Sequence, residues 1–435
     1  MTTAVLVPHL LAGAMIAATV DDGHLPGRRI LVTINDAAIP EITSDIADHP
    51  GFASLASRFD AVVSLNEAIA PLHPRGWAAD GPPARSARAR IAQLAVETVD
   101  RVVVPSLDHL PSAAFTQMFP QARVDVVADR LATYGPAPAH VNRDISARVE
   151  RVFYADLVPG TTPRMFGNVG ATPVPVATES LRRAIGAMAG SPAAEDLEEA
   201  WILGERLADL GILTPAQQDA LQLAMIEAAA EAGYSAVAFK PHPNSRPGYH
   251  GALAERAARL SIRFRVLTDP EPAEVMFERT RPGAVLGSSS TALAIASAVY
   301  GIPAFSVGTA DVARAMTRED EPQRVALALT RVMLPTFDNG EHPPLDVEAQ
   351  SLLDVLCHDM QPRRYRRPDS AALEAVRACD GAQQLVDAPA GAHPRREPAA
   401  VRAEGVFGRI GASSPRRRYR SVRNVLAALW FSVRL

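Results

Sequence analysis

The feature that most constrains the fold of this chain is the alternation of short apolar runs with stretches that can form helices. In the first half the apolar runs are AVLVPH (4–9), RRILVTIN (28–35), FDAVVSLN (59–66), VDRVVVPS (99–106), ARVDVVAD (122–129) and RVFYADLV (151–158). Helix-compatible stretches such as residues 84–99 lie between several of them. This alternation is typical of a parallel sheet covered by helices on both faces.

A second series of the same kind begins near residue 199. Its apolar runs are EAWILGERL (199–207), SAVAFKPHP (235–243), SIRFRVLT (261–268), GAVLGSSSTALAIASAVYG (283–301) and IPAFSVG (302–308). A helix is predicted over 214–234, because Thr214 can cap it, Pro215 suits its first position and Gly233 lies near its end.

These two series predict an α/β chain of two Rossmann-like domains that face a cleft. We place the first domain at residues 1–190 and the second at 195–385, joined by the polar, alanine-rich segment 188–199. Composition alone also allows other two-domain α/β enzymes.

The last part of the chain, residues 386–435, is predicted to be an appendage. Residues 386–405 have the Pro/Ala/Arg composition of a linker. Residues 413–435 combine an arginine cluster with apolar residues spaced by three and four, which is the pattern of a basic amphipathic helix. Such a helix can lie on anionic membrane lipid. It can equally dock onto the acidic body of its own protein or remain disordered.

Composition excludes several other classes of protein. A net charge of −4 over 435 residues is not that of a nucleic-acid-binding protein. Two cysteines make neither a disulfide framework nor a zinc site, so we expect a reducing cytoplasm. The N-terminus lacks the basic region and cleavage site of a signal peptide, and we interpret it as a strand and a helix.

The segment FKPHPNSRP (239–247) is the first candidate site, where a strand runs into a proline-stiffened loop. Ligands bind just beyond the carboxyl ends of parallel strands. Lys240, the only lysine of the chain, and His242 would present a cation and an imidazole there. A protonated imidazole can donate a hydrogen bond to an anionic leaving group, so the loop suits a phosphate. The alternative is a histidine that only packs between Pro241 and Pro243.

The segment LGSSSTALAIA (286–296) is the second candidate, with Gly287 and four hydroxyl residues, Ser288, Ser289, Ser290 and Thr291, between a strand and an apolar helix. The start of a helix binds anions through its exposed N–H groups, although the same residues can simply cap the helix. Both candidates follow strands of one domain. We therefore expect two neighbouring loops that bind one phosphate.

The KPHP, SSST and upstream ILGERLADLGILT segments resemble the bacterial sialyltransferase and alpha-2,8-polysialyltransferase families over roughly residues 4–310. The resemblance implies a GT-B glycosyltransferase that moves sialic acid or a related nonulosonic acid from a CMP donor to a glycan acceptor, with inversion. It places the acceptor on the first domain and the nucleotide sugar on the second. It assigns the CMP phosphate to His242, with Pro243 shaping the loop, and to the four hydroxyl residues; Lys240 would support the phosphate.

The resemblance also implies a general base from an acid-acid-Gly motif at the end of a first-domain strand. Residues 128–130 read Ala-Asp-Arg there, so Asp129 is the candidate base. A literal Asp-Asp-Gly at 21–23 follows a helix and is interpreted as a turn; Asp22 and Glu67 come next if Asp129 is not the base. This departure leaves room for a chain that binds without catalysing. Asn66 and Glu67 are candidate acceptor contacts, unless they only start a helix.

No metal and no cofactor are predicted, since CMP leaves as a phosphate monoester and no metal-ligand spacing is present. The predicted partners are a CMP-nonulosonic acid donor, a glycan or glycolipid acceptor and an anionic membrane surface, with no nucleic acid. This describes a cytoplasmic protein, peripheral on the inner membrane face, that builds capsule or cell-surface polysaccharide. A transferase of the CDP-polyol phosphotransferase type and a non-catalytic CMP- or glycan-binding protein remain the alternatives.

Overall fold

The computed structural model describes most of the first 387 residues. The described ranges are 1–37, 40, 43–77, 79, 81–95, 98–107, 110–190, 195–242, 250–269, 271–317, 321–338 and 340–387. Pro243, most of the predicted linker 386–405 and the whole tail 413–435 lie outside them. The described residues all belong to one unit, Met1–Ala390.

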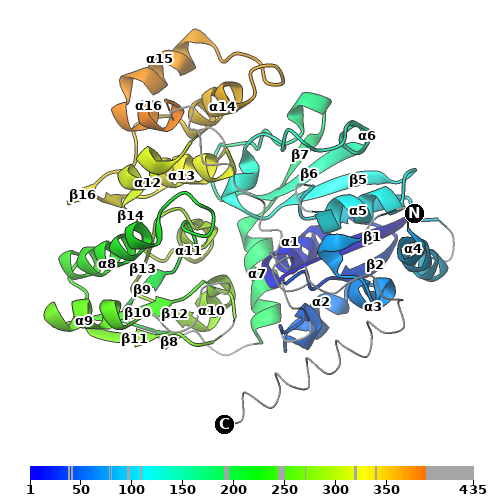
Figure 1. Ribbon diagram of the computed structural model, residues 1–435, viewed down its shortest axis with the longest axis horizontal. Helices are drawn as coiled ribbons and strands as arrows, with labels where there is room; N and C mark the ends of the chain where they lie inside the picture. The colour runs from blue at the N-terminus through cyan, green and yellow to red at the C-terminus, as the bar shows by residue number, and fades with distance from the viewer. Residues whose placement is uncertain are drawn as a thin grey trace, which may run out of the picture. The chain divides into compact units, whose positions relative to one another are not determined.

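Seven described strands form the first sheet, in the order β3-β2-β1-β4-β5-β6-β7 (Figure 1). Their bounds are β1 Thr2–Val7, β2 Arg28–Thr33, β3 Ala61–Ser64, β4 Arg101–Val104, β5 Arg123–Ala128, β6 Val149–Ala155 and β7 Thr172–Val176. All neighbouring pairs are parallel. Every predicted apolar run of the first half overlaps a strand. The sequence did not reveal β7, whose two prolines are tolerated because it is an edge strand.

The second sheet also has seven described strands and repeats this order, as β11-β10-β9-β13-β14-β15-β16. Their bounds are β9 Ala200–Leu203, β10 Ala236–Lys240, β11 Arg263–Val266, β13 Ala284–Gly287, β14 Ala304–Val307, β15 Thr336–Phe337 and β16 Glu341–His342. Only β16 runs antiparallel to its neighbour among these strands. In both sheets the strand order reverses beside the first strand, at β1/β4 and at β9/β13. The predicted α/β chain with two Rossmann-like sheets is confirmed.

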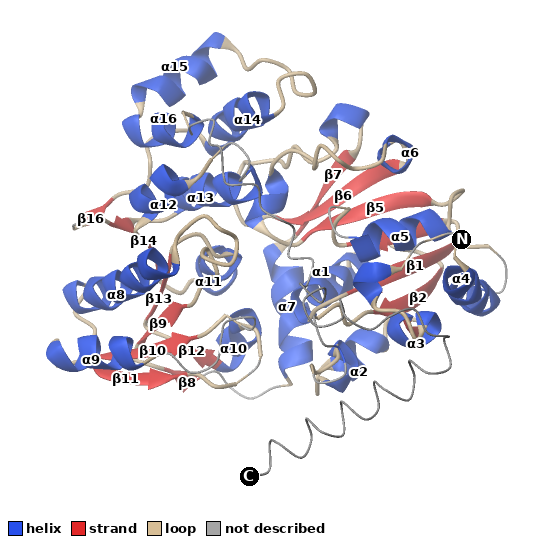
Figure 2. Ribbon diagram, viewed as in Figure 1, coloured by secondary structure: helices blue, strands red, loops and turns tan. Residues whose placement is uncertain are grey.

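Helices flank both sheets (Figure 2). Those of the first half are α1 Leu10–Asp21, α2 Phe52–Ala56, α3 Leu65–Ile69, α4 Pro82–Ala95, α5 Leu110–Met118, α6 Arg143–Ser146 and α7 Thr178–Ala189. Those of the second half are α8 Pro215–Glu231, α9 Gly251–Arg259, α10 Ala273–Arg279, α11 Thr291–Tyr300, α12 Thr309–Ala315, α13 Glu321–Met333, α14 Ala349–Met360, α15 Ser370–Ala378 and α16 Asp380–Val386. Short 3-10 helices are η2 Ile46–Asp48, η3 Pro74–Gly76, η4 Leu131–Tyr134 and η5 Gly167–Val169.

The apolar N-terminal segment forms β1 and α1, as the sequence predicts. Every residue of β1 is buried, and so are residues 10–19 of α1, because the helix packs on the sheet and against α7. An all-apolar helix needs such cover on every side. No helix in the described ranges is long and apolar enough to span a bilayer.

Helix α8 begins and ends at the residues that the sequence indicates. Thr214 Oγ1 accepts a hydrogen bond from Gln217 N at 3.3 Å, and Gln217 Oε1 accepts one from Thr214 N at 2.8 Å. This reciprocal capping box satisfies two N–H groups that have no partner inside the helix. Gly233 follows the helix with φ of 87°, in the left-handed region that favours glycine.

The connection between the two sheets is only partly the loop that we expected over 188–199. Helix α7 extends to Ala189, and Glu195–Asp196 forms a short strand, β8, which pairs with β12 (Thr280–Arg281). Helix α7 packs against α1 of the first half and against α10 and α11 of the second. Residues 191–194 lie outside the described residues, and the boundaries at 190 and 195 remain a prediction.

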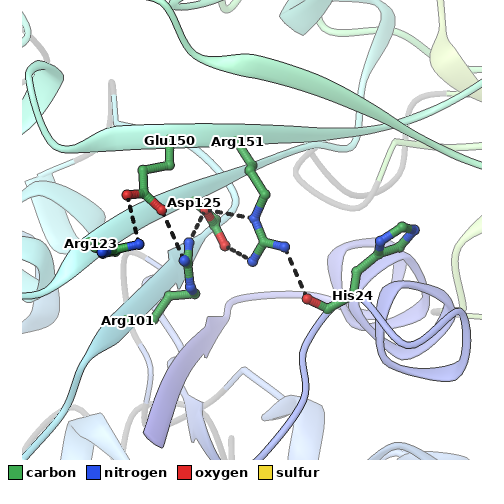
Figure 3. A network of polar contacts seen from close by, with 6 residues as sticks. All are labelled: His24, Arg101, Arg123, Asp125, Glu150 and Arg151. Carbon is green, nitrogen blue, oxygen red and sulfur yellow. Dashed lines mark hydrogen bonds and ion pairs between the residues drawn. The ribbon is translucent and has the colours of Figure 1, made fainter. Parts of the chain in front are cut away.

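A buried charge network ties β4, β5 and β6 together, away from the carboxyl ends of these strands (Figure 3). The Asp125 side chain is 0% exposed and accepts hydrogen bonds from Arg101 Nη1 at 2.5 Å and Arg151 Nη2 at 2.6 Å. Burial is the largest influence on the pKa of Asp125 and raises it, while both arginines act in the opposite direction. Glu150 completes the network on its exposed side, 2.9 Å from Arg101 Nη2.

We predict that Asp125→Asn lowers the free energy of unfolding by about 3–5 kcal/mol, because it removes the buried counter-charge that Arg101 and Arg151 share and leaves Arg101 only the partly exposed Glu150. Denaturation in urea measures the effect. Glu150→Gln is the matched control, and we expect less than about 1 kcal/mol because Glu150 is partly exposed. Equal stability of the two variants would contradict the structural role of Asp125.

Candidate functional site

The second sheet places a third loop between the two that the sequence singled out. Strand β9 lies between β10 and β13, so the His242 loop and the serine turn are not direct neighbours, contrary to our expectation. Residues 204–206, which follow β9, occupy the position between them. Gly204 N donates to Lys240 O at 2.8 Å, and a Cβ atom on Gly204 would lie 3.0 Å from His242 N. The site is therefore built from three adjacent strand ends.

Lys240 ends β10 and is buried, with 7% of the residue exposed. Its Nζ donates a hydrogen bond to the carbonyl oxygen of Asp269, which anchors the loop after β11. Burial lowers the pKa of Lys240, whereas Asp269 and Glu274 raise it. The ammonium group thus bonds to the protein's own backbone, and the predicted phosphate contact stays a prediction.

His242 lies just beyond β10 and is partly buried. Burial lowers its pKa to about 4, and the charges of Arg206 and Lys240 act in the same direction, against Asp209. The ring is therefore neutral at pH 7, not protonated as we expected. A neutral imidazole still carries one N–H group that can donate a hydrogen bond to a phosphate.

The serine turn between β13 and α11 already holds an anion, the carboxylate of Glu205. Glu205 Oε1 accepts hydrogen bonds from the backbone N–H groups of Ser288 at 2.5 Å and Ser289 at 2.9 Å. Burial of the carboxylate is the largest influence on its pKa and raises it, while the serine hydrogen bonds lower it. The backbone donors of the turn therefore bind an anionic group of the protein itself, and the predicted phosphate contact of the turn stays a prediction.

The other hydroxyl residues have distinct places in the turn. Ser290 caps α11 by accepting from Ala292 N at 3.3 Å, which is the plain capping role. Thr291 Oγ1 accepts from Leu131 N at 3.2 Å and so joins the turn to η4 of the first half. The hydroxyl of Ser288 is buried and has no hydrogen-bond partner among the described residues.

Asp129 directly follows β5, as the sequence predicts, and its side chain is 1% exposed. Its Oδ2 lies 3.2 Å from Nε2 of His9, and its Oδ1 lies 3.4 Å from Nε of Arg130. Burial alone would raise the pKa of Asp129, but His9 and Arg130 outweigh it and hold the pKa below its usual value. Asp129 is therefore ionised at neutral pH.

His9 covers this carboxylate and is itself 49% exposed at the side chain. It follows β1 and caps α1, since its Nδ1 accepts from Ala12 N at 3.3 Å. When Nδ1 accepts this hydrogen bond, the proton of the neutral ring resides on Nε2 and points at Asp129. His9 thus occupies the β1/β4 reversal of the first sheet, where a ligand is expected.

Glu274, in the first turn of α10, shows that the two halves contribute to one neighbourhood. Burial raises the pKa of Glu274, His9 and Lys240 lower it, and Asp129 raises it further. Charges from the ends of β1, β5 and β10 therefore act on one carboxyl group. The predicted residues Asp129 and Lys240, which are far apart in the sequence, therefore both influence the pKa of Glu274.

The predicted acceptor residues lie elsewhere, after the edge strand β3. The side chain of Asn66 bonds to both backbone groups of Asn35, at 2.9 and 2.8 Å, and so links the ends of β2 and β3. Glu67 lies in α3 and is exposed. Four strand spacings separate β3 from β5, roughly 19 Å along the sheet. Their acceptor role stays a prediction.

Asp22 is a turn residue, as its position after a helix indicates. It caps the C-terminus of α1 and accepts from Ser180 Oγ at 2.7 Å. Helix α1 begins after the carboxyl end of β1 and leads away from it. Asp22 therefore lies toward the amino ends of the strands, whereas Asp129 lies at their carboxyl ends. Asp22 is excluded as an alternative base.

Three site residues escaped the sequence analysis: His9, Glu205 and Glu274. A signal was present for the first two, because each is a polar residue within two positions of the end of a fully buried strand. Glu205 also lies inside the ILGERLADLGILT segment. Within the described ranges, no group of three or more His, Cys, Asp or Glu side chains is arranged to hold a metal ion.

Two Rossmann-like sheets whose strand-end loops are joined through Thr291 define a GT-B type of chain. A family model for alpha-2,8-polysialyltransferase (POLYST) matches residues 5–309. Because the match covers more than half of the 435 residues, the chain belongs to the alpha-2,8-polysialyltransferase family and is a glycosyltransferase. The resemblance seen in the short motifs is confirmed.

Solved structures give weaker likenesses. A glycosyltransferase from Rickettsia africae ESF-5 has a TM-score of 0.38 and 11% identity over 71% of this chain and 79% of that chain. MurG of Acinetobacter baumannii has a TM-score of 0.38 and 11% identity over 89% of this chain and 98% of that chain. These TM-scores are too low for the likenesses to carry an argument. A search of curated proteins returned no significant match.

We predict that His242 makes the folded protein sensitive to acid. A histidine with an ordinary pKa of 6.5 in the unfolded chain falls to about 4 here, so folding favours the neutral ring. This contribution to stability is complete above pH 6.5 and is lost as the pH falls toward 4. Between neutral pH and pH 4, wild type should therefore lose up to about 3 kcal/mol more stability than His242→Asn, which has no imidazole to protonate.

Urea denaturation across this pH range measures the difference. The matched control is His342→Asn, because His342 is an exposed histidine of the same half. Parallel stability curves for wild type and His242→Asn would show that the loop histidine is not held neutral.

Proposed function

We propose that this glycosyltransferase moves sialic acid or a related nonulosonic acid from a CMP donor to a glycan acceptor, with inversion. The observation that carries the proposal is the hydrogen bond from Leu131 N to Thr291 Oγ1, which joins the segment after Asp129 in the first half to the serine turn of the second. Asp129 and Lys240 also both act on the pKa of Glu274. An inverting transfer needs a base on the acceptor side and charge stabilisation on the leaving-group side. Family membership supplies the class of reaction.

In the proposed step Asp129 takes the proton of the acceptor hydroxyl. The acceptor oxygen attacks the anomeric carbon of the donor sugar from the face opposite the phosphate. The bond from that carbon to the phosphate oxygen breaks, and CMP leaves with the electron pair. One displacement of this kind inverts the anomeric configuration. Because the His9 ring covers Asp129, the acceptor hydroxyl displaces this ring to reach the carboxylate.

On the leaving-group side, the neutral His242 ring donates its N–H to the CMP phosphate. The negative charge that develops there raises the pKa of the imidazole and strengthens this hydrogen bond. The hydroxyl of Ser288 supplies a second donor, since it lacks a partner among the described residues. The step requires no metal and no cofactor, because CMP departs as a phosphate monoester.

We predict that Asp129→Asn lowers the transfer rate by about 10²–10⁴-fold, because an amide cannot accept the proton. CMP affinity, measured by titration calorimetry, should stay unchanged because Asp129 belongs to the first sheet. His242→Ala should weaken CMP binding and lower the rate together. Asp144→Asn, an exposed acid in α6, is the control and should keep the full rate. A fully active Asp129→Asn would place the base elsewhere, with Glu67 the next candidate.

Donor identity is tested by a thermal-shift assay with a panel of nucleotides. CMP should raise the apparent melting temperature more than CDP or UDP, because a ligand that binds only the folded state stabilises it. Release of CMP from a CMP-nonulosonate in the presence of a glycan acceptor completes the test. A preference for CDP would favour a transferase of the CDP-polyol phosphotransferase type.

We further propose that the protein acts in the cytoplasm, at the inner membrane face, in the synthesis of a capsule or cell-surface polysaccharide. The support is the sequence of residues 413–435, where an arginine cluster adjoins an apolar stripe that includes Trp430. Arginine attracts anionic lipid, and tryptophan is favoured at the membrane interface.

Removal of residues 413–435 is expected to shift the protein from the membrane fraction to the supernatant on sedimentation with anionic vesicles. Replacement of Arg416, Arg417 and Arg418 by glutamine keeps the apolar stripe and should reduce binding only in part. Equal sedimentation of the truncated and full-length chains would refute the membrane role.

A further inference from the structure

The carboxylate of Glu205 occupies the position where a parallel sheet most often binds a ligand. It follows β9, and the strand order of the second sheet reverses between β9 and β13. Its Oε1 lies on the N–H groups of Ser288 and Ser289, at 2.5 and 2.9 Å. A Cβ atom on Gly287 would come within 3.2 Å of the same oxygen. The protein itself thus places an anion in its own anion-binding nest.

Most hydrogen-bond donors of this turn are already used, so the turn can offer only a few hydrogen bonds to a phosphate. The two backbone N–H groups are committed to Glu205, and the Ser289 side chain also bonds to it. The one hydroxyl of the turn without a described partner is that of Ser288, which is fully buried. A buried hydroxyl without a hydrogen bond is costly, so this group indicates a ligand atom beside Glu205.

The charges around this position are of both signs. Arg206 follows Glu205 directly, and its charge acts on His242 together with those of Lys240 and Asp209. The cations favour an anionic ligand, whereas the buried carboxylate repels each negative charge that the ligand carries. The first negative charge of a ligand is therefore balanced by the cations, and a second one meets the repulsion of Glu205.

We propose that Glu205 is a specificity-determining residue that favours a singly charged phosphodiester over a doubly charged phosphomonoester. The inference rests on the proposed function for the nature of the two ligands: the CMP-linked donor is a diester, and the product CMP is a monoester. A phosphomonoester has a second pKa of about 6 and so carries close to two charges above neutral pH. Cleavage of the donor therefore adds a charge beside Glu205 and weakens the hold on the product.

The test compares CMP with its methyl ester, which keeps the base and ribose but has a singly charged phosphate. Titration calorimetry at pH 8 should show that wild type binds the ester more tightly than CMP. In Glu205→Gln the side-chain oxygen still accepts the serine N–H groups while the charge is lost. This variant should bind CMP about tenfold more tightly than wild type and the ester only about threefold, on the scale of one close charge pair.

Asp209→Asn is the matched control, because it removes a negative charge near His242 and keeps the carboxylate on the serine turn. It should change the preference for the ester less than Glu205→Gln does, because Asp209 is not hydrogen-bonded to the serine turn. An equal effect of Glu205→Gln on both ligands, or the same change of preference in both variants, would overturn the inference.

A second measurement protects the test against a variant that does not fold. In wild type, CMP should bind less tightly at pH 8 than at pH 5, because its second ionisation lies between these values. The methyl ester has no such ionisation and reports the titration of the protein alone, including that of His242. If CMP and the ester show the same pH dependence, Glu205 does not select on ligand charge.

Failure of the donor assignment gives a different result. If wild type binds neither CMP nor its ester, the proposed function is wrong, and methyl phosphate and dimethyl phosphate replace the nucleotides in a thermal-shift assay. A stabilisation by methyl phosphate at pH 8 that is greater in Glu205→Gln than in wild type sustains the role of Glu205. The same stabilisation in both proteins, or none in either, overturns it.

Discussion

The hydrogen bonds from the serine turn to the Glu205 carboxylate hold together the part of the second sheet on which the rest of the site depends. They join the end of β9 to the start of α11 across the point where the strand order reverses. In the same segment, Gly204 N donates a hydrogen bond to Lys240 O and so holds the start of the loop after β10. Thr291 then carries the connection to Leu131 and η4 of the first half. A single acidic loop thus positions both candidate phosphate loops and, through the turn, a residue two positions from Asp129.

The two sheets share a strand order, and each has a polar residue of its own at the reversal point. In the first sheet this residue is His9, and in the second it is Glu205. Each of them contacts a group to which the proposed function gives a role: His9 lies against Asp129, and Glu205 accepts hydrogen bonds from the serine N–H groups. An open sheet leaves a crevice at this point, and a buried donor or carboxylate without a partner there is costly. The serine N–H groups are paired with Glu205, and the Asp129 carboxylate has His9 and Arg130 as ion-pair neighbours, so a substrate has to offer at least as good a partner.

Much of the fold could be predicted because the signals are local. Apolar runs identify the strands, and Thr214 with Gly233 marks both ends of a helix. Strand order is not local, and for this reason the two candidate loops were placed side by side when β9 separates them. Asp125 was equally hidden, since within RVDVVA it reads as an interruption of an apolar strand; only the arginines of two neighbouring strands make its burial possible. Chemical type points to His242 and Asp129, whereas the sequence marks Glu205 only as a polar residue after a buried strand, and its serine partners become known only from the structure.

The neutral state of His242 fits the charge pattern of the site. Arg206 and Lys240 already supply positive charge near the ring, and burial adds to the cost of a third cation, which holds the pKa of His242 at about 4. A ring that is neutral before the ligand binds can still donate one hydrogen bond to a phosphate. As the leaving group gains its second charge, the balance at the ring shifts toward the protonated form, while the same charge is opposed by Glu205. In the proposed transfer, the imidazole would therefore stabilise the departing phosphate most strongly when the bond breaks, and the Glu205 carboxylate would limit how long that phosphate stays.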